Sequence, residues 1–381
     1  MALRNWGIAY FHYLTGTGSH HCWDWPALAL LRGAAWLYRK GVLAKYHAIA
    51  DHPERQEHVP AVVISLGNIT VGGTGKTPTA CMLARHLQSQ GWRVALLNRG
   101  YRSQSEAGGA VVMSDGQHVL LSAEEGGDEA CLMACSLPGI PVLVGRKRAL
   151  GGRLAVERFG TQVLILDDGF QHWQLYRDLD IVLIDGTNPF GNGHVLPRGI
   201  LREPMEQLGR ADAFIITKRD QIAEHQAKAI IAKLRQYNPA APVAMAIHKP
   251  SSCLAFAAWY DGKGHGAGSL QPDGRSVLAV SALGNPASFE RTLTDAGFTV
   301  AGSIRYEDHH HYSRDDIRHM AARAAETGCL LVTTEKDAVK LPAPLIKEYD
   351  LPLYVLSITI EFTAGQEQID TILQAVLEDK L

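Results

Sequence analysis

The residues from 62 to 78, VVISLGNITVGGTGKTP, constrain this chain more than any other stretch. A branched-apolar run, typical of a buried strand, leads into a loop with three glycines, and Lys76 and Thr77 then open an amphipathic stretch. Bare backbone N–H groups beside a helix N-terminus bind anions, so the segment predicts a phosphate-binding loop. A glycine-rich turn without a ligand is the alternative.

The loop departs from the common pattern at one position. In G-x-x-x-x-G-K-[ST] the first glycine stands six positions before the lysine, and here that position is Thr70. We expect a different turn into the loop but an intact cradle, with Lys76 on the β- and γ-phosphates and Thr77 on Mg²⁺. The predicted nucleotide-binding residues are Thr70, Val71, Gly72, Gly73, Thr74, Gly75, Lys76 and Thr77.

Short apolar runs alternate with amphipathic stretches after residue 60. The runs lie at 61–66, 93–98, 141–145, 162–168, 180–185 and 213–218, with helical patterns such as 77–91 and 146–160 between them. This alternation predicts an α/β fold, a P-loop NTPase-like and mostly parallel sheet flanked by helices. Residues 110–122 predict a hairpin that turns at Asp115-Gly116.

A seam rich in Gly, Pro and Ser, residues 248–275, precedes a second stretch of α/β alternation. The chain of 381 residues suits about two domains at ~150 residues each. We therefore expect an N-terminal helical segment at 1–55, a P-loop domain at 56–250 and a smaller C-terminal α/β lobe at 251–381.

Composition excludes several classes of protein. A hydrophobic content of 46% with 20% charged residues is that of an ordinary globular protein. A formal net charge of −2 gives no reason to expect a nucleic-acid partner. Six cysteines are too sparse for a disulfide scaffold, so buried or neutral thiols are expected. The N-terminus lacks the pattern of a cleavable signal.

Residues 25–48, WPALALLRGAAWLYRKGVLAKYHA, are apolar and aromatic but interrupted by basic residues. A spanning helix needs about 20 mostly apolar residues, so we expect this one not to cross a bilayer. It suits a helix in the membrane interface, with tryptophans at headgroup depth and basic residues near lipid phosphates. A soluble helix packed on its domain is the alternative.

Carboxylates follow two predicted elements. Asp167 and Asp168 end the predicted strand at 162–168, where P-loop enzymes hold Mg²⁺, and they point to opposite sides if the strand persists. Asp128 follows two glycines at the start of a helical pattern, where it either caps the helix or takes part in chemistry.

Three further segments leave alternatives open. In YEDHHHYSRDD (306–316) the histidines are either a solvated cluster or include one positioned by Asp308 for acid–base work. In LPRGILREP (196–204), Arg198 and Arg202 either neutralise a phosphate or phosphorylated substrate, or are solvated loop charges. ITKRD (216–220) resembles the guanine-reading element of GTPases but suits an ordinary strand end equally.

Taken in order, these motifs closely resemble the tetraacyldisaccharide 4′-kinase family, the lipid A 4′-kinases of Gram-negative envelope synthesis. The resemblance covers residues 25 to 380, and Thr70 itself matches the family. The matching phrases are SLGNITVGGTGKTP (65–78), NRGYR (98–102), GDEA (127–130), LDDGFQH (166–172), LPRGILREP (196–204), DHHHY (308–312) and TTEKDAVK (333–340).

The resemblance implies transfer of the ATP γ-phosphate to the 4′-hydroxyl of a tetraacylated glucosamine disaccharide 1-phosphate, with Mg²⁺. It implies that Asp128 is the base, that His309 is its partner and that Lys76 is also catalytic. Ala130 stands where proline is common, and the adjacent His310 and His311 leave the choice of histidine open. The family's remaining roles fall on Asp167, Asp168 and Glu203 for the metal and on Arg202 and Asn68 for the substrate.

The implied acceptor also implies a location. We expect the chain at the cytoplasmic face of the inner membrane, peripheral or anchored by its N-terminal helix, with the lipid surface and the glycolipid as partners and no obligate protein partner. The alternative function is a P-loop nucleotide switch or metallochaperone-type GTPase, in which TKRD selects GTP and the histidines bind metal.

Overall fold

The computed structural model describes residues 10, 13–16, 18, 21–100, 109–260, 269–307 and 310–380. Its contacts divide the chain into two compact units. Unit 1 comprises Met1–Lys76, Val156–Ile247 and Glu361–Leu381, and unit 2 comprises Thr77–Ala155 and His248–Ile360. The units interleave along the sequence, and the domain limits predicted at residues 55 and 250 stay a prediction.

Unit 1 contains a parallel sheet that carries the predicted phosphate-binding loop. Its strands run in the order β8-β7-β6-β1-β5, and the registered neighbours are all parallel. Every residue of β1 is buried, as expected for a strand covered on both faces. The strands are β1 (Val62–Gly67), β5 (Val163–Asp167), β6 (Leu179–Asp185), β7 (Ala213–Thr217) and the first part of β8 (Val243–Ala255).

The principal helices of unit 1 are α2 (Trp25–Ala50), α7 (Glu224–Tyr237) and α13 (Gln366–Lys380), together with the short 3₁₀ helices η1 (Cys22–Asp24), η2 (Pro53–Arg55), η4 (Met205–Arg210) and η5 (Arg219–Gln221). Ala35 of α2 packs in one core cluster with Ile69, Phe170 and Val195. Within the described ranges, no helix combines the length and the apolarity needed to cross a bilayer.

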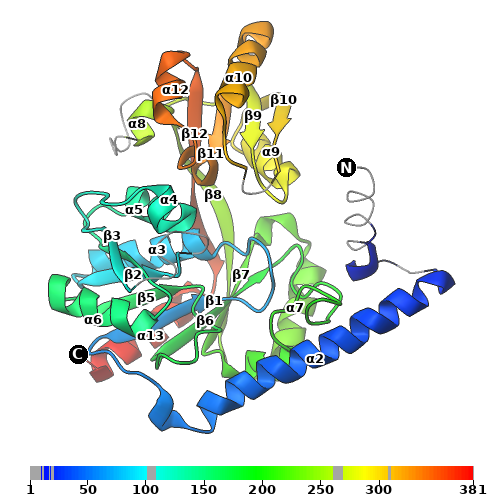
Figure 1. Cartoon of the computed structure of the whole chain (residues 1–381), viewed down its shortest axis with the longest axis vertical. Coiled ribbons are helices and arrows are strands. Elements are labelled where there is room, and N and C mark those ends of the chain that lie inside the picture. The colour runs from blue at the N-terminus through cyan, green and yellow to red at the C-terminus, as the bar shows by residue number, and fades with distance from the viewer. Residues whose placement is uncertain are drawn as a thin grey trace. The chain divides into compact units, whose positions relative to one another are not determined.

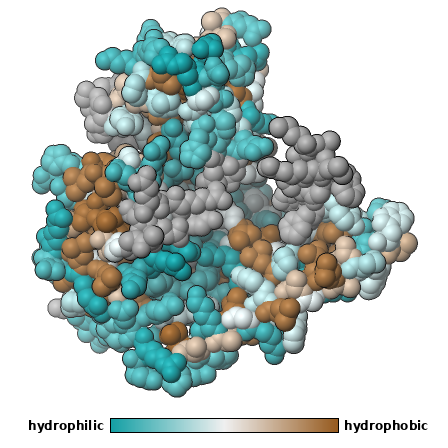
Figure 2. Space-filling view, in the orientation of Figure 1, coloured by the Kyte–Doolittle hydropathy of each residue, from teal (hydrophilic) through white to brown (hydrophobic). Residues whose placement is uncertain are grey.

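The long helix α2, drawn in blue in Figure 1, has two different faces. Leu28 and Ala35 are buried, whereas Leu30, Trp36 and Leu37 are exposed to 76%, 58% and 65%. Figure 2 shows brown, apolar residues along the region where Figure 1 places this helix. A soluble helix normally turns its apolar side chains toward the core, so the exposed face of α2 is unusual.

Unit 2 contains two groups of strands, in the orders β2-β4-β3 and β10-β9-β11-β12-β8. All the registered neighbours are parallel except β3 and β4. The strands are β2 (Val94–Asn98), β3 (Val111–Ser114), β4 (Val142–Val144), β9 (Ser276–Ser281), β10 (Thr299–Arg305), β11 (Leu330–Thr334), β12 (Leu353–Ala364) and the second part of β8. With the helices of both units, these strands confirm the predicted α/β class.

The helices of unit 2 include α3 (Lys76–Ser89), which follows the phosphate-binding loop, and α5 (Asp128–Ser136), which begins at the predicted base. Apolar side chains of β9, β11 and α10 share one core cluster in this unit. The remaining helices are α4 (Ala123–Gly126), α6 (Arg148–Phe159), α8 (Phe256–Tyr260), α9 (Pro286–Asp295), α10 (Arg314–Thr327), α11 (Glu335–Ala338) and α12 (Ala343–Glu348).

Two sequence predictions differ from the structure in unit 2. The hairpin at 110–122 has its turn, where Asp115 Oδ1 accepts from the backbone of His118 at 2.7 Å, but its return is a single bridge between Ser114 and Val119. The seam predicted from residue 248 is strand until Ala255, because β8 continues through Pro250 and the serines.

Candidate active site

The loop between β1 and α3 shows why a threonine fits where a glycine was expected. Thr70 is 4% exposed and forms an antiparallel bridge with Leu201. Beside it, Arg202 N donates to Ile69 O at 2.7 Å. Extended backbone of this kind suits a β-branched residue, and the first positive φ comes later, at Gly72 with 124°. The altered turn is therefore a short piece of paired strand.

Four polar side chains meet beyond the carboxyl ends of β1 and β5, and we call Asn68, Lys76, Asp168 and Arg202 the loop cluster. Lys76 Nζ lies 3.5 Å from Asp168 Oδ1 and donates to Asn68 Oδ1 at 3.3 Å. Arg202 Nη1 donates to the same two oxygens, at 2.6 and 3.2 Å. Two cations therefore converge on one carboxylate, with which an incoming phosphate must compete.

Hydrogen bonds from within unit 1 hold the loop in shape. The buried Asn68 donates through Nδ2 to Thr74 Oγ1 at 3.1 Å and to Thr70 Oγ1 at 3.4 Å. Thr217, at the end of β7, donates through Oγ1 to Thr74 O at 3.0 Å. Buried and satisfied polar groups of this kind fix one conformation, so the loop is shaped before any ligand arrives.

The three carboxylates predicted to bind metal have different surroundings. Asp167 is 1% exposed at the end of β5, whereas Asp168 takes a left-handed backbone with φ 54° and joins the loop cluster. Glu203 is fully buried, and its two oxygens accept from Gln171 Nε2 at 2.6 Å and from Arg210 Nη2 at 2.7 Å. Burial raises the pKa of Glu203, and the charge of Arg210 opposes that rise.

The oxygen chemistry of these carboxylates and of Thr77 fits Mg²⁺, which proteins hold with one or two carboxylates plus substrate phosphates. In the part of the chain that the structure describes, no three His, Cys, Asp or Glu residues gather as a complete protein cage for a metal ion. The donor set therefore suits a metal that arrives with a nucleotide. Glu203, whose oxygens are both engaged, suits a supporting role.

Arg210 lies among aromatic rings, and we call Arg210 with Tyr46, Phe170 and Trp173 the arginine cage. The guanidinium carbon is 4.0 Å from the Phe170 ring centre, 5.0 Å from that of Tyr46 and 5.7 Å from that of Trp173. Cation–π contacts stabilise such a charge when it is desolvated. The cage links α2, through Tyr46, to Glu203 beside the loop cluster.

The lysine of the ITKRD segment takes part in an ion pair within the protein, as at an ordinary strand end. Lys218, which follows β7, forms an ion pair with Asp185 at 2.5 Å. Burial and the Lys218 charge act in opposite directions on Asp185, and the net effect lowers its pKa. Asp220, the residue expected to accept from a guanine, is exposed in η5.

Asp128 is the first residue of α5, and it does not cap the helix. The N-cap is Gly127, with φ 95°, and no side chain accepts a capping hydrogen bond there. A carboxylate in the first turn is stabilised by the helix dipole. The capping alternative is therefore wrong, and the catalytic role of Asp128 stays a prediction.

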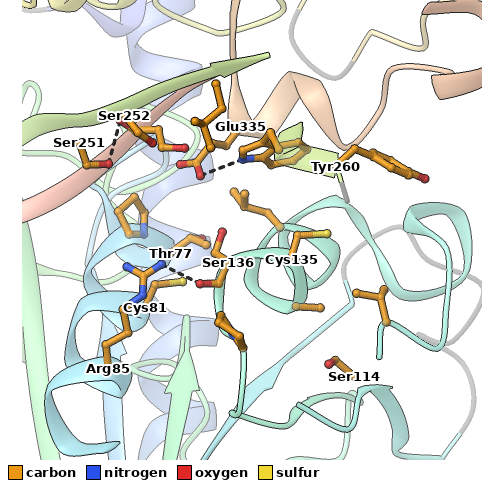
Figure 3. A pocket seen from close by; sticks show the side chains of 18 of the residues that line it. Thr77, Cys81, Arg85, Ser114, Cys135, Ser136, Ser251, Ser252, Tyr260 and Glu335 are labelled. Carbon is orange, nitrogen blue, oxygen red and sulfur yellow. Dashed lines mark hydrogen bonds between the residues drawn. The ribbon is translucent and has the colours of Figure 1, made fainter. Parts of the chain in front are cut away.

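A cavity of about 830 Å³ lies in unit 2 (Figure 3). Its lining includes Thr77, the last residue of the loop, together with Arg85 on α3, Cys135 on α5 and Glu335 on α11. Glu335 Oε1 accepts from Trp259 Nε1 at 3.4 Å, and burial raises the pKa of Glu335. Polar and apolar side chains contribute to the lining in similar numbers, so the cavity offers hydrogen-bonding groups as well as apolar contacts.

Cys131 and Cys135 lie one turn apart on α5 and interact. A hydrogen bond between the two thiols raises the pKa of Cys131 and lowers that of Cys135. The two thiols of α5 therefore differ in acidity, and Cys135 is the more acidic of the pair.

The histidine segment is described only in part, since Asp308 and His309 lie outside the described residues. His310 Nε2 lies 3.0 Å from Asp316 Oδ2, and its ring stacks on Tyr306 with 4.6 Å between centres. His310 therefore has a structural partner at the start of α10. His309 stays the predicted partner of the base, and His311 is exposed.

Sequence reasoning missed Arg210, Gln171 and Glu335. Gln171 and Glu335 lie inside the motifs LDDGFQH and TTEKDAVK, so the motifs marked the segments without showing which side chains matter. Arg210 lies in no motif, and only the folded chain brings it to Glu203 and three rings.

A strand, a glycine loop and a helix that begins with lysine and threonine, facing a strand that ends in carboxylates, define a P-loop enzyme of phosphate transfer. A model of the family described as tetraacyldisaccharide-1-P 4′-kinase matches residues 27–378. The chain therefore belongs to this family, the kinases of lipid A biosynthesis, and the predicted resemblance is confirmed.

Individual relatives agree with this assignment. A tetraacyldisaccharide 4′-kinase of Halothermothrix orenii is 44% identical over 79% of this chain and 80% of its own length. One from Anaeromyxobacter sp. strain K is 42% identical over 92% of this chain and 88% of its own. The crystal structure of LpxK from Aquifex aeolicus in complex with ATP has a TM-score of 0.72 and 28% identity, covering 92% of this chain and 99% of that one.

Proposed function

We propose that this kinase transfers the γ-phosphate of ATP, bound with Mg²⁺, to the 4′-hydroxyl of a tetraacylated disaccharide 1-phosphate at a membrane surface. The observation that carries the proposal is the loop cluster, which aims Lys76 and Arg202 at one point beside a phosphate-binding loop in a chain of this family. Converging cations neutralise the charge of a transferring phosphoryl group, which is the main source of rate in such enzymes.

The residues divide the work as follows. Lys76 and the backbone of Gly72 to Thr77 hold the triphosphate. Mg²⁺, held by Thr77 with Asp167 or Asp168, would neutralise the β- and γ-oxygens. Asp128 accepts the proton of the sugar hydroxyl, with His309 as its partner, and Arg202 and Asn68 orient the acceptor. Glu203 supports this set through Gln171 and Arg210.

The nucleoside part of ATP is assigned to the cavity of unit 2. Thr77, which follows Lys76 directly in the chain and belongs to the predicted phosphate-binding loop, is among the lining residues of this cavity, and this supports the assignment. The lining supplies apolar surface together with hydrogen-bonding side chains such as those of Arg85 and Glu335.

The decisive experiment uses γ-labelled ATP and the tetraacylated disaccharide 1-phosphate. The expected product is a bisphosphorylated lipid labelled at the 4′ position, formed by the wild type and not by Lys76→Met. Rapid GTP hydrolysis without any acceptor, and no labelled lipid, would instead favour the nucleotide switch. The paired Lys218 and exposed Asp220 give that alternative no specific support.

Membrane association through α2 rests on its exposed apolar face. Trp36 and Leu37 are well exposed, and Lys40 lies 5.8 Å from the Trp36 ring, a pairing suited to the headgroup region. The double substitution Trp36→Ser with Leu37→Ser should weaken sedimentation with anionic vesicles by roughly tenfold or more, since each buried apolar side chain contributes about 1.5–3 kcal/mol. Leu150→Ser, at an exposed leucine on α6, is the control. Equal loss in both variants would contradict the assignment of α2.

A further inference from the structure

Arg198 is a buried cation without an anionic partner. Its side chain belongs to a residue that is 6% exposed, and Nη1 donates to Leu14 O at 2.9 Å. Nε, also buried, has no hydrogen-bond partner. Among the residues that the structure describes, no Asp or Glu forms an ion pair with this guanidinium. A buried charge that lacks a counter-charge costs several kcal/mol.

Other largely buried arginines of unit 1 differ from Arg198. Arg177 Nε donates to Asp180 Oδ1 at 2.9 Å, and Arg210 Nη2 donates to Glu203 Oε2 at 2.7 Å. Each of these cations is neutralised inside the protein. Arg198 therefore differs from these two arginines in lacking a carboxylate partner, and a bound anion would supply one.

The nearest charged groups increase the excess of positive charge. Burial and the charge of Arg32, on α2, lower the pKa of Arg198. Burial and the charges of Arg198 and Arg32 lower the pKa of His194, in the preceding loop. The packing agrees, because Ala35, one turn beyond Arg32, shares a core cluster with Val195. Arg32 and His194 are exposed, so a ligand in solvent can reach both side chains.

The position of these cations along the chain connects two parts of the proposed site. Arg198 precedes Arg202 of the loop cluster by four residues, so their Cα atoms lie at most ~14 Å apart. Arg32 lies 5.5 Å from the ring centre of Trp25, which belongs to the exposed apolar side of α2. A lipid whose acyl chains follow α2 and whose hydroxyl reaches the loop cluster passes beside them.

We propose that Arg198, with Arg32 and His194 beside it, binds the phosphate group that the lipid acceptor already carries. We call these three residues the phosphate clamp. The inference rests on the proposed function and adds to it the group by which the acceptor is recognised. The clamp holds the phosphorylated end of the disaccharide while the other end presents its hydroxyl for transfer. The anion supplies the charge that Arg198 lacks.

The test compares two acceptors in neutral detergent, the tetraacylated disaccharide with a 1-phosphate and the same lipid with a free 1-hydroxyl. For the wild type we expect kcat/KM to favour the phosphorylated acceptor by roughly ten- to hundredfold, as for other hydrogen bonds to charged groups. In Arg198→Met this preference should fall to near unity, and Arg198→Lys should retain part of it. Arg39→Met, which removes a basic residue of α2 that pairs with Glu206, should keep the full preference.

Several results would overturn the inference. If the wild type uses both acceptors equally well, the clamp is wrong and the kinase assignment stands; if it uses neither, the proposed function fails instead. An equal loss on both acceptors in Arg198→Met would show a purely structural arginine. Should that variant not fold, the exposed Arg32→Met and His194→Gln carry the test, with an expected loss of preference of roughly three- to tenfold each. An effect seen only as weaker binding to phosphatidylglycerol vesicles would assign the anion to a lipid headgroup and refute the acceptor phosphate.

Discussion

The loop cluster of unit 1 and the cavity of unit 2 treat their ionisable groups in opposite ways. In the loop cluster, Lys76 and Arg202 both pair with Asp168, so every charged group has a partner and one positive charge remains. In the cavity, Glu335 and Cys135 have pKa values shifted by burial and by a neighbouring thiol. Phosphate that binds at the loop cluster must compete with Asp168 for the two cations. The pKa values of the cavity residues, in contrast, change with the ligand that fills the cavity. The comparison makes separate predictions for each region.

The largest effect is expected at the start of α5 in unit 2. Asp128→Asn should lower kcat by about 10²–10⁴-fold, the usual contribution of a general base, with little change in KM for ATP. Steady-state kinetics with the lipid acceptor measures both constants. Glu129→Gln, at the next and more exposed position, is the control and should remain active. A normal kcat in Asp128→Asn would show that Asp128 is not the general base.

The loop cluster should show its largest effect at Lys76. Lys76→Met should lower kcat by about 10²–10³-fold, because a cation aimed at developing charge is lost. The fold should persist, since Asp168 keeps Arg202 as a partner at 2.6 Å. Thermal unfolding alongside single-turnover phosphate transfer separates these two properties. A variant that loses activity only by unfolding would show that Lys76 is structural.

Substitutions in the arginine cage should lower the free energy of unfolding more than they lower the rate of phosphate transfer. Arg210→Met leaves the fully buried Glu203 without its cation and should cost about 3–5 kcal/mol in the free energy of unfolding. Adding Glu203→Gln should recover much of that stability, since no buried charge then remains. Denaturant titration gives both values, and if the double variant is no more stable than Arg210→Met, the loss comes from the rings instead.

A substitution of Asp168 tests whether this carboxylate competes with phosphate for the cations of the loop cluster. With Mg²⁺ chelated, Asp168→Asn should bind ADP about two- to fivefold more tightly, because an ion pair of this exposure contributes up to ~1 kcal/mol. With Mg²⁺ present the same variant should turn over more slowly, since a metal-associated carboxylate is lost. Isothermal titration and kinetics measure the two arms. Weaker binding in both conditions would mean that Asp168 does not compete with phosphate.

The smallest effect concerns the thiol in the cavity. Because its pKa is lowered, the reaction of Cys135 with maleimide should reach half its maximal rate at a lower pH than the reaction of an ordinary solvated thiol. Cys131→Ala removes the thiol that donates to Cys135 and should slow this reaction at neutral pH. Saturating ATP should protect Cys135 but not the exposed Cys22, as mass spectrometry of the labelled peptides would show. Unchanged labelling of Cys135 under ATP would place the nucleoside elsewhere.

Local sequence signals predicted most of the fold and the core of the site. The buried runs at 61–66 and 162–168 became β1 and β5, and the helix predicted at 77–91 became α3. These elements are set by hydrophobic periodicity and by loop chemistry between neighbours in sequence. The contiguous segment 62–78 was therefore informative by itself.

The rest depended on contacts between distant segments. β8 contains Pro250 and two serines, so its composition indicated a linker, and only pairing with other strands makes it a strand. The arginine cage joins α2, the segment after β5 and η4, which no local pattern relates. The pairing of Arg198 with Leu14 is likewise invisible in sequence, because buried and solvated arginines look alike there.

The bridge between Thr70 and Leu201 has a consequence for how each substrate affects the binding of the other. Leu201 bridges to Thr70 of the nucleotide loop and also to Val195, which stands before the turn that contains Arg198. Because one residue pairs with both segments, we expect the binding of the phosphate donor and of the phosphorylated acceptor to be coupled. By thermodynamic reciprocity, the factor by which bound nucleotide strengthens acceptor binding equals the factor by which acceptor strengthens nucleotide binding. The coupling measured as a change in affinity for one substrate therefore also gives the change for the other.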